Sequence, residues 1–241
     1  ILYGLGVGPG DPELMTLKAA RVLNSVDMVY AAASTKNSYS LAVSIAKPHI
    51  PDLTPVKMLM FPMTSDEEEK QRAWDDHARI IINEVEQGKK VAFLTLGDSM
   101  TYSTYGYLMR SVMTIAPDLP VISIAGITSY QAAAARLNTP LVEGEESLLI
   151  TSGANGGDNL RKLAVAPENV VFLKAYRNAG DIVAALEEAN LIENSVGINA
   201  CSLPREEIIQ DITAFKTRPA DYWTLILAKQ KKINGPSQEK A

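Results

Sequence analysis

Three short turns in this sequence combine glycine with polar side chains. The first is GLGVGPGDP, Gly4 to Pro12, in which four glycines lie between a strand pattern and the start of a helix. In the second, Leu94 to Ser99, a strand pattern runs into a glycine and a carboxylate, and the hydroxyl side chains of residues 101–104 follow. The third is Ala125 to Tyr130. Glycine lets the backbone approach a ligand closely, and helix N-termini favour anions. Together the turns predict a site for a small polar ligand.

Neither familiar nucleotide loop accounts for these turns. Counting G-x-G-x-x-G from Gly4 puts Pro9 at the third glycine, and no G-K-[ST] follows. Each turn alone also has a local explanation: a tight turn at positive φ, or a helix N-cap supplied by Asp98 or Thr128. Their common position favours a ligand, because all three follow strand patterns, and ligands of open α/β sheets bind at the carboxyl ends of strands.

The first 140 residues alternate strand and helix patterns, which predicts an α/β fold. Asp11 and Pro12 carry start signals for one helix, while Ser65 with Glu68 forms a capping box for another that should stop at Gly88. We expect buried, parallel strands at 1–7, 26–31, 91–96 and 121–125, and helices at 12–23, 41–46, 66–87, 103–115 and 129–137.

A polar, proline-containing stretch from Asn138 to Ser147 is typical of a linker. Beyond it, the last three strand patterns leave no room for helices between them, which predicts a mixed sheet. We expect domains at 1–140 and 146–230 and a flexible tail at 231–241. The predicted strands are 148–151, 170–175, 196–201, 207–212 and 222–228, with helices near 160–164 and 181–189.

Composition excludes several functional classes. The 23 basic and 28 acidic residues give a net charge of −5, so no basic field favours nucleic acid. One cysteine and two histidines make metal hydrolysis and Ser-His-Asp catalysis unlikely, and we expect no protein-bound metal. No apolar run reaches the length of a membrane span, so we expect no membrane partner and a cytoplasmic protein.

Other reactive or apolar residues have simpler interpretations. Cys201 lies in an apolar strand pattern and is expected to be a small buried hydrophobe. Met58, Met60 and Met63, near Phe61, could fill a loop or line a ligand wall, and the sequence does not decide between them.

The three turns, in this order and separation, resemble the tetrapyrrole methylase family. That family has G-x-G-x-G-P-G-D-P at the start, a G-D-P strand end and a P-G-[IV]-[TS]-[SA] turn. The segment LGDSMTYSTYGYL is most similar to the subgroup that methylates C20 of precorrin-2 or cobalt-precorrin-2. Ser99 and Ala125 depart from the pattern, because both replace prolines. The resemblance implies two α/β domains, S-adenosylmethionine in the cleft between them, and a homodimer.

The resemblance also assigns roles to individual residues. It implies that Asp98 and Tyr102 are the candidates for orienting the reactants or accepting a proton. Residues Gly8, Pro9, Gly10 and Asp11 should face the tetrapyrrole, and the acceptor's carboxylates make Lys36, Arg110, Arg177 and Arg205 candidate partners. The methyl donor should contact Val7, Gly97, Asp98, Ser99, Tyr102, Thr128, Ser129, Leu173, Lys174 and Ala200.

The expected function is therefore C-methylation of precorrin-2 or cobalt-precorrin-2 in cobalamin biosynthesis, with S-adenosylmethionine as donor. Two alternatives stay open. The chain could belong to another branch of the same fold, such as diphthine synthase or a ribosomal-RNA ribose methyltransferase. It could instead bind tetrapyrrole or donor without turnover.

Overall fold

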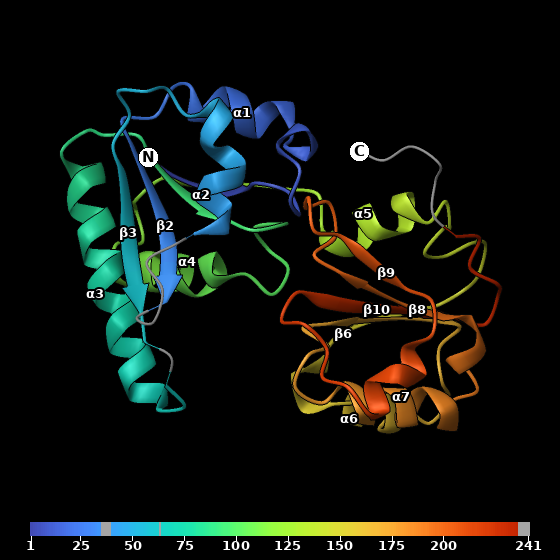
Figure 1. Ribbon diagram of the computed structural model, residues 1–241. Helices are drawn as coiled ribbons and strands as arrows, with labels where there is room; N and C mark the ends of the chain where they lie inside the picture. Colours follow the sequence, from blue (N-terminus) through green and yellow to red (C-terminus); the bar gives the residue numbers. More distant parts are fainter. Residues whose placement is uncertain (35–39, 63, 236–241) are drawn as a thin grey trace. The chain divides into compact units, whose positions relative to one another are not determined.

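The computed structural model describes residues 1–34, 40–62 and 64–235 (Figure 1). The chain divides into two compact units, Ile1–Thr128 and Ser129–Ala241. This division falls at the beginning of the helix Ser129–Arg136 rather than in the polar stretch 138–147, since that helix contacts the last strand of the second unit. No helix in the described residues is long and apolar enough to cross a membrane.

The first unit is a five-stranded, all-parallel sheet of order β3-β2-β4-β1-β5. Every residue of β4 is buried, as expected for a strand with neighbours on both sides and helices on both faces. Helices α1 and α2 cover one face, and α3 and α4 cover the other. The elements are β1 (Leu2–Gly6), α1 (Leu17–Leu23), β2 (Met28–Ser34), α2 (Leu41–Ala46), β3 (Val56–Phe61), α3 (Glu67–Glu86), β4 (Val91–Thr95), α4 (Thr104–Ile115) and β5 (Val121–Ile124).

Strand β3 is absent from the sequence-based prediction. It is one of the two edge strands of the sheet, and its residues alternate between exposed and more buried positions. Met58 and Met60 therefore belong to a strand and not to a loop, and Met63 lies outside the described residues. Lys57 interrupts the apolar residues of β3, so this strand lacks the continuous apolar run by which the other strands of the sheet were predicted.

Two predicted helix starts are wrong in detail. The segment from Pro12 forms only a short 3-10 turn. Helix α1 is a separate helix with Thr16 as its N-cap, whose hydroxyl accepts from the Ala19 N–H at 3.2 Å. Asp66, not Ser65, caps α3, because its carboxylate accepts from the N–H groups of Glu68 and Glu69. Both helices thus begin with a side-chain N-cap, as predicted, but Thr16 and Asp66 supply it in place of Asp11 and Ser65.

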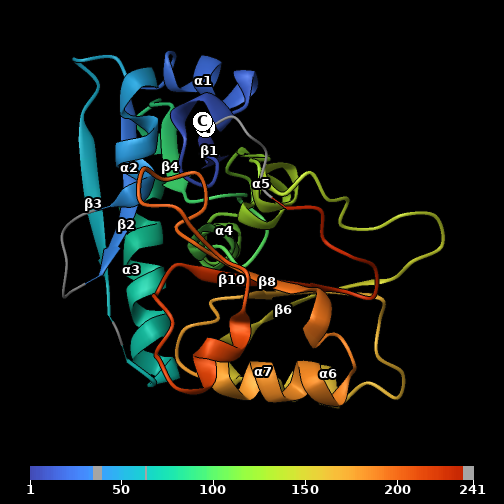
Figure 2. The same ribbon diagram turned by 45° about the vertical axis from the view of Figure 1, so that its right-hand side comes forward.

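The second unit is a mixed sheet of order β6-β7-β10-β8-β9, in which β10 runs antiparallel to both neighbours. Strands β6, β7 and β8 therefore share one direction and end at the same edge. Figure 2 shows α6 and α7 along one face of this sheet. The elements are α5 (Ser129–Arg136), β6 (Leu148–Ser152), α6 (Asp158–Arg161), β7 (Asn169–Leu173), α7 (Ala179–Glu188), β8 (Ser195–Asn199), β9 (Glu207–Ile209) and β10 (Thr224–Lys229).

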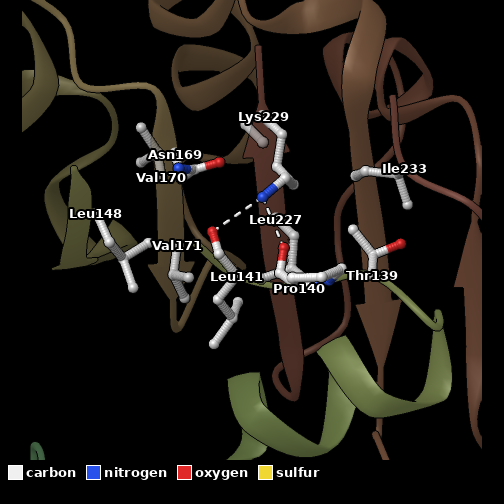
Figure 3. Close-up of a pocket in the computed structure, with 11 residues that line it drawn as sticks. Thr139, Pro140, Leu141, Leu148, Asn169, Val170, Val171, Leu227, Lys229 and Ile233 are labelled. Atoms are coloured by element: carbon white, nitrogen blue, oxygen red, sulfur yellow. Dashed lines mark hydrogen bonds between the residues drawn. The ribbon is translucent and has the colours of Figure 1, made fainter. Parts of the chain in front are cut away.

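The described part of the predicted flexible tail is held by polar contacts. The Asn234 N–H donates to Thr139 Oγ1 at 2.9 Å, and Lys231 pairs with Glu146 at 2.5 Å. The Lys229 ammonium is buried and donates to the carbonyls of Pro140 and Leu141 at 2.6 and 3.0 Å (Figure 3). The cavity beside it has a volume of about 10 Å³, enough for one water molecule but not for an organic ligand.

Replacing Gly4 should destabilise the first unit. A Cβ at this position would lie 1.9 Å from Cζ of the buried Tyr105 ring. We expect Gly4→Ala to lower the free energy of unfolding by about 1–3 kcal/mol through overpacking. The control is Gly106→Ala in α4, where a Cβ meets no atom within 4 Å, and which should stabilise by roughly 1 kcal/mol. Urea unfolding of both variants checks this, and an unchanged Gly4→Ala midpoint would contradict it.

The Glu146 cluster should make stability depend on acid pH. A hydrogen bond from Lys231, with a second from Asn169, lowers the Glu146 pKa from 4.5 to about 2. Because folding lowers this pKa, the stabilisation is fully present above about pH 4.5 and is lost as the pH falls through about 2. We expect Glu146→Gln to be less stable than the native protein at pH 7 and equal near pH 2. Glu193→Gln, an exposed change, should alter neither curve; parallel native and Glu146→Gln curves would contradict the assignment.

Candidate functional site

The carboxyl ends of β4, β1 and β5, which are neighbours in the first sheet, bring the three polar turns together. The backbone of Gly8 pairs with that of Gly97, with N–H to oxygen distances of 3.1 and 2.7 Å. The Val7 N–H donates to the Thr95 carbonyl at 3.0 Å. Helix α1, after β1, and helix α4, after β4, cover opposite faces of the sheet. The adjacent strands β1 and β4 therefore form a topological switch point, where α/β sheets bind ligands.

Glycine is required where these turns meet. A Cβ at Gly6 would lie 2.6 Å from the Gly97 carbonyl oxygen, and a Cβ at Gly126 would lie 2.2 Å from the same atom. Any larger residue would push the turns apart. The close approach of three backbones leaves carbonyl and N–H groups, rather than side chains, as the main lining of this edge.

Asp98 fastens the second turn to the third. Its Oδ2 accepts from the Gly126 N–H at 3.0 Å, and its Oδ1 accepts from the Met100 N–H and the Thr101 hydroxyl at 2.9 and 3.1 Å. Both carboxylate oxygens are thus engaged in holding backbone. The structure favours a positioning role for Asp98 over its predicted role as a proton acceptor.

Ser99 provides a second tie between the same two turns. The side chain is fully buried, and its hydroxyl donates to the Ile124 carbonyl at 3.0 Å. This carbonyl immediately precedes Ala125, the other position at which the chain departs from the family pattern. The serine therefore supplies by a hydrogen bond a restraint that proline would supply through its ring. Its side chain is not free to contact a ligand.

Tyr102 and Thr128 complete the first-unit candidates. Tyr102 is half-exposed and takes a left-handed backbone with φ of 49°, which is rare outside glycine and asparagine. Thr128 is buried at the end of the unit, and Ser129 begins α5. Residues Gly8, Pro9 and Gly10 are buried within the unit, while Asp11 caps the 3-10 turn by accepting from the Glu13 N–H at 2.8 Å.

In the second unit, the predicted donor-binding residues lie at one sheet edge. Leu173 ends β7, and Lys174 and Ala200 follow β7 and β8 with left-handed φ of 58° and 50°. Such backbones cost on the order of 1–3 kcal/mol each and occur often at ligand sites. By contrast, Asn138 and Asn190 take positive φ behind helices, where asparagine is an ordinary cap.

Two polar residues at this edge were not predicted. Asn199 and Thr224 face each other in the β8–β10 pairing, and both are buried. Among the described residues, Asn199 Oδ1 and Thr224 Oγ1 find no hydrogen-bond partner. A buried polar atom without a partner is costly, so this pair suits a polar ligand or a bound water. The sequence signal was a polar residue at one end of each strand, since Asn199 ends β8 and Thr224 begins β10.

The remaining candidates are dispersed. Lys36 lies outside the described residues, and Arg110 is exposed on α4 with its guanidinium 4.8 Å from the centre of the Tyr107 ring. Arg205 pairs with Asp221 at 3.8 Å, whereas Arg177 lies over the Tyr176 ring. Burial raises the pKa of the Cys201 thiol to about 11, so this cysteine is not an activated nucleophile. The described residues contain no group of acidic, histidine or cysteine side chains arranged for a metal ion.

Comparison with known proteins identifies the family of the chain. Residues 1–214 match the family model for tetrapyrrole (corrin/porphyrin) methylases. The chain is 35% identical over 230 residues to cobalt-precorrin-2 C(20)-methyltransferase of Salmonella typhimurium, covering 95% of this chain and 96% of that protein. It is also 35% identical over 173 residues to a probable cobalt-precorrin-2 C(20)-methyltransferase of Methanocaldococcus jannaschii, covering 72% and 71% of the two chains.

A solved structure supports the fold. Uroporphyrin-III C-methyltransferase from Thermus thermophilus, complexed with S-adenyl homocysteine, matches with a TM-score of 0.66 at 22% identity, covering 95% of this chain and 97% of that one. The two-unit α/β architecture predicted from the sequence is thereby confirmed. With its three glycine turns joined at one sheet edge and a family match over most of its length, the chain belongs to the tetrapyrrole methylase family.

Proposed function

We propose that this chain transfers the methyl group of S-adenosylmethionine to C20 of cobalt-precorrin-2. The observation that carries the proposal is the 35% identity, over 95% of the chain, to the Salmonella enzyme of that name. Both relatives described above carry the cobalt form in their names, which favours it over metal-free precorrin-2. Homodimerisation and a cytoplasmic location are further predictions that follow from the resemblance.

The residues of the first unit fit the donor. Backbone carbonyls crowded around Gly6, Gly97 and Gly126 suit the positive charge of a sulfonium, and the buried Thr128 lies within the third turn. Carbonyl and carboxylate oxygens attract the sulfonium cation, whereas a basic loop of the kind that binds phosphates would repel it. We infer that Val7, Gly97, Asp98, Tyr102 and Thr128 form the first-unit part of the donor site, and that Ser129, the residue after Thr128, also contributes to it.

The residues of the second unit also fit the donor. Leu173, Lys174 and Ala200 offer backbone groups at a strained edge, and the orphaned oxygens of Asn199 and Thr224 lie at the same edge. An amide oxygen and a hydroxyl can bond the amino and hydroxyl groups of a nucleoside. We propose that they add polar contacts to the donor.

Methyl transfer makes modest chemical demands on the protein. The sulfonium supplies an already activated methyl group, so the chain's task is to align donor and acceptor carbon in line. Holding reactants in such a geometry can lower the barrier by roughly 7–11 kcal/mol. Asp98 and Ser99 act indirectly by fixing the turns. Tyr102, half-exposed beside Asp98, is the remaining candidate for orienting the acceptor or receiving its proton.

The assignment is tested by a mass-resolved assay with labelled S-adenosylmethionine and, in parallel, cobalt-precorrin-2 and precorrin-2. We expect one methyl group to appear at C20, faster on the cobalt form. A faster reaction with precorrin-2 would support the methyltransferase assignment but would make precorrin-2, and not cobalt-precorrin-2, the preferred acceptor. Donor binding without transfer to either compound would contradict the proposed reaction and favour another acceptor or a carrier.

The ties made by Asp98 and Ser99 should govern donor binding. Ser99→Ala removes the buried hydrogen bond to the Ile124 carbonyl, which should lower the free energy of unfolding by about 0.5–1.5 kcal/mol and raise the KM for the donor more than it lowers kcat. Asp98→Asn replaces one carboxylate oxygen with an NH2 group, which cannot accept the hydrogen bonds from the facing N–H or O–H groups. The KM of this variant for S-adenosylmethionine should therefore rise further.

Urea unfolding and steady-state kinetics measure both effects. The control is Ser44→Ala, an exposed serine of α2 whose hydroxyl donates within its own helix, which should change neither quantity. Donor KM values equal to the native one in both Asp98→Asn and Ser99→Ala would contradict the positioning role.

A further inference from the structure

The loop that follows β7 and the segment that leads into β10 meet at the carboxyl edge of the second sheet. The Ala175 N–H donates to the Thr224 carbonyl at 3.0 Å, which sets the residues on either side of this contact next to each other. The rings of Tyr176 and Tyr222 are consequently 4.8 Å apart, and Trp223 packs edge-on against Tyr222 at 4.9 Å. The three aromatic residues form one cluster.

This cluster is open to solvent. The side chain of Tyr222 is 53% exposed, although two aromatic neighbours contact it. Tyrosine and tryptophan gathered on a surface are typical of a recognition site, because they offer large flat faces together with polar edges. A flat conjugated ligand can pack against such faces.

Arg177 adds a cation that has no acidic partner among the residues that the structure describes. Its guanidinium lies 5.4 Å from the centre of the Tyr176 ring. In the described part of the second unit, each of the other arginines pairs with a carboxylate, and Arg177 pairs with none. Those four are Arg136 with Glu206, Arg161 with Asp181, Arg205 with Asp221 and Arg218 with Glu207.

An unpaired guanidinium beside a flat ring is suited to one kind of ligand. Arginine binds carboxylates through two parallel hydrogen bonds, and its planar group tolerates stacking. With a net charge of −5, the chain repels polyanions in general, so an unneutralised cation gives local selectivity. A conjugated macrocycle bordered by carboxylate side chains matches both features.

We propose that Tyr176, Arg177 and Tyr222 form a docking platform for the acceptor, with the tyrosine rings against the macrocycle and Arg177 on one of its carboxylates. The platform deepens the proposed function and rests on it for the identity of the acceptor. It is a binding element and takes no part in the methyl transfer itself.

Direct binding tests the platform without turnover. The probe is uroporphyrin III, a stable, fluorescent and carboxylate-rich tetrapyrrole, titrated into the full chain while its fluorescence is followed. We expect Arg177→Gln to weaken binding about tenfold, as for loss of a charge-assisted hydrogen bond. Arg177→Lys keeps the positive charge but cannot donate two parallel hydrogen bonds, so its affinity for the probe should lie between those of the native chain and Arg177→Gln. Tyr222→Leu should also weaken binding.

Two controls separate the platform from general effects. Arg218→Gln removes another exposed arginine that lies over an aromatic ring, 5.9 Å from the centre of Phe215, and should bind the probe as the native chain does. The dissociation constant of S-adenosylhomocysteine should stay unchanged in Arg177→Gln and Tyr222→Leu. Raising the salt concentration should weaken native binding more than that of Arg177→Gln.

The outcomes distinguish the platform from the proposed reaction. If native protein binds the probe and Arg177→Gln and Tyr222→Leu bind equally well, the platform is wrong while the methyltransferase assignment stands. If native protein binds no tetrapyrrole, the platform is also wrong. If native protein binds the probe through these residues but methylates neither precorrin, the platform holds and the proposed reaction fails.

Discussion

The carboxylate of Asp98 is the contact on which the first-unit site depends. Glycines allow the strand ends to come within van der Waals distance, but closeness alone does not fix their relative position. Asp98 does so by accepting from Gly126 across the sheet edge while holding Met100 and Thr101 in its own turn. Ser99 reinforces the same junction from the buried side. The backbone groups that line the edge are thereby fixed before any ligand arrives.

In the second unit, the arrangement of the strands determines which residues meet at the carboxyl edge of the sheet. Its sheet carries an antiparallel strand between β7 and β8, so β10 starts where its two neighbours end. Lys174 and Ala200, which follow β7 and β8, take left-handed backbones at this edge. The hydrogen bond from the Ala175 N–H to the Thr224 carbonyl holds the start of β10 against the loop after β7. Strained backbone, buried polar atoms and the Tyr176–Arg177–Tyr222 platform therefore gather at one edge of the sheet.

The elements that could be predicted from the sequence are those that residues close together in the chain define. The central strands β1, β2 and β4 were predicted because burial on both faces gives continuous apolar runs. The edge strand β5 was predicted because residues 121–125 carry no charge, and the turns because glycine and polar residues end these runs. The other edge strand, β3, was not predicted because Lys57 interrupts its apolar residues. The hydrogen bond between Ser99 and Ile124 joins residues far apart in the chain, which no local pattern records. The same holds for Arg177, which has no acidic partner within residues 1–34, 40–62 and 64–235.

The most direct test of the account is hydrogen–deuterium exchange, read by mass spectrometry, with and without S-adenosylhomocysteine. If the three turns form one donor site, peptides covering residues 6–10, 97–102 and 125–129 should all exchange more slowly in the presence of the ligand. Peptides from the exposed face of α3 should be unaffected. Protection confined to one turn, or located away from all three, would contradict the claim that this sheet edge binds the methyl donor.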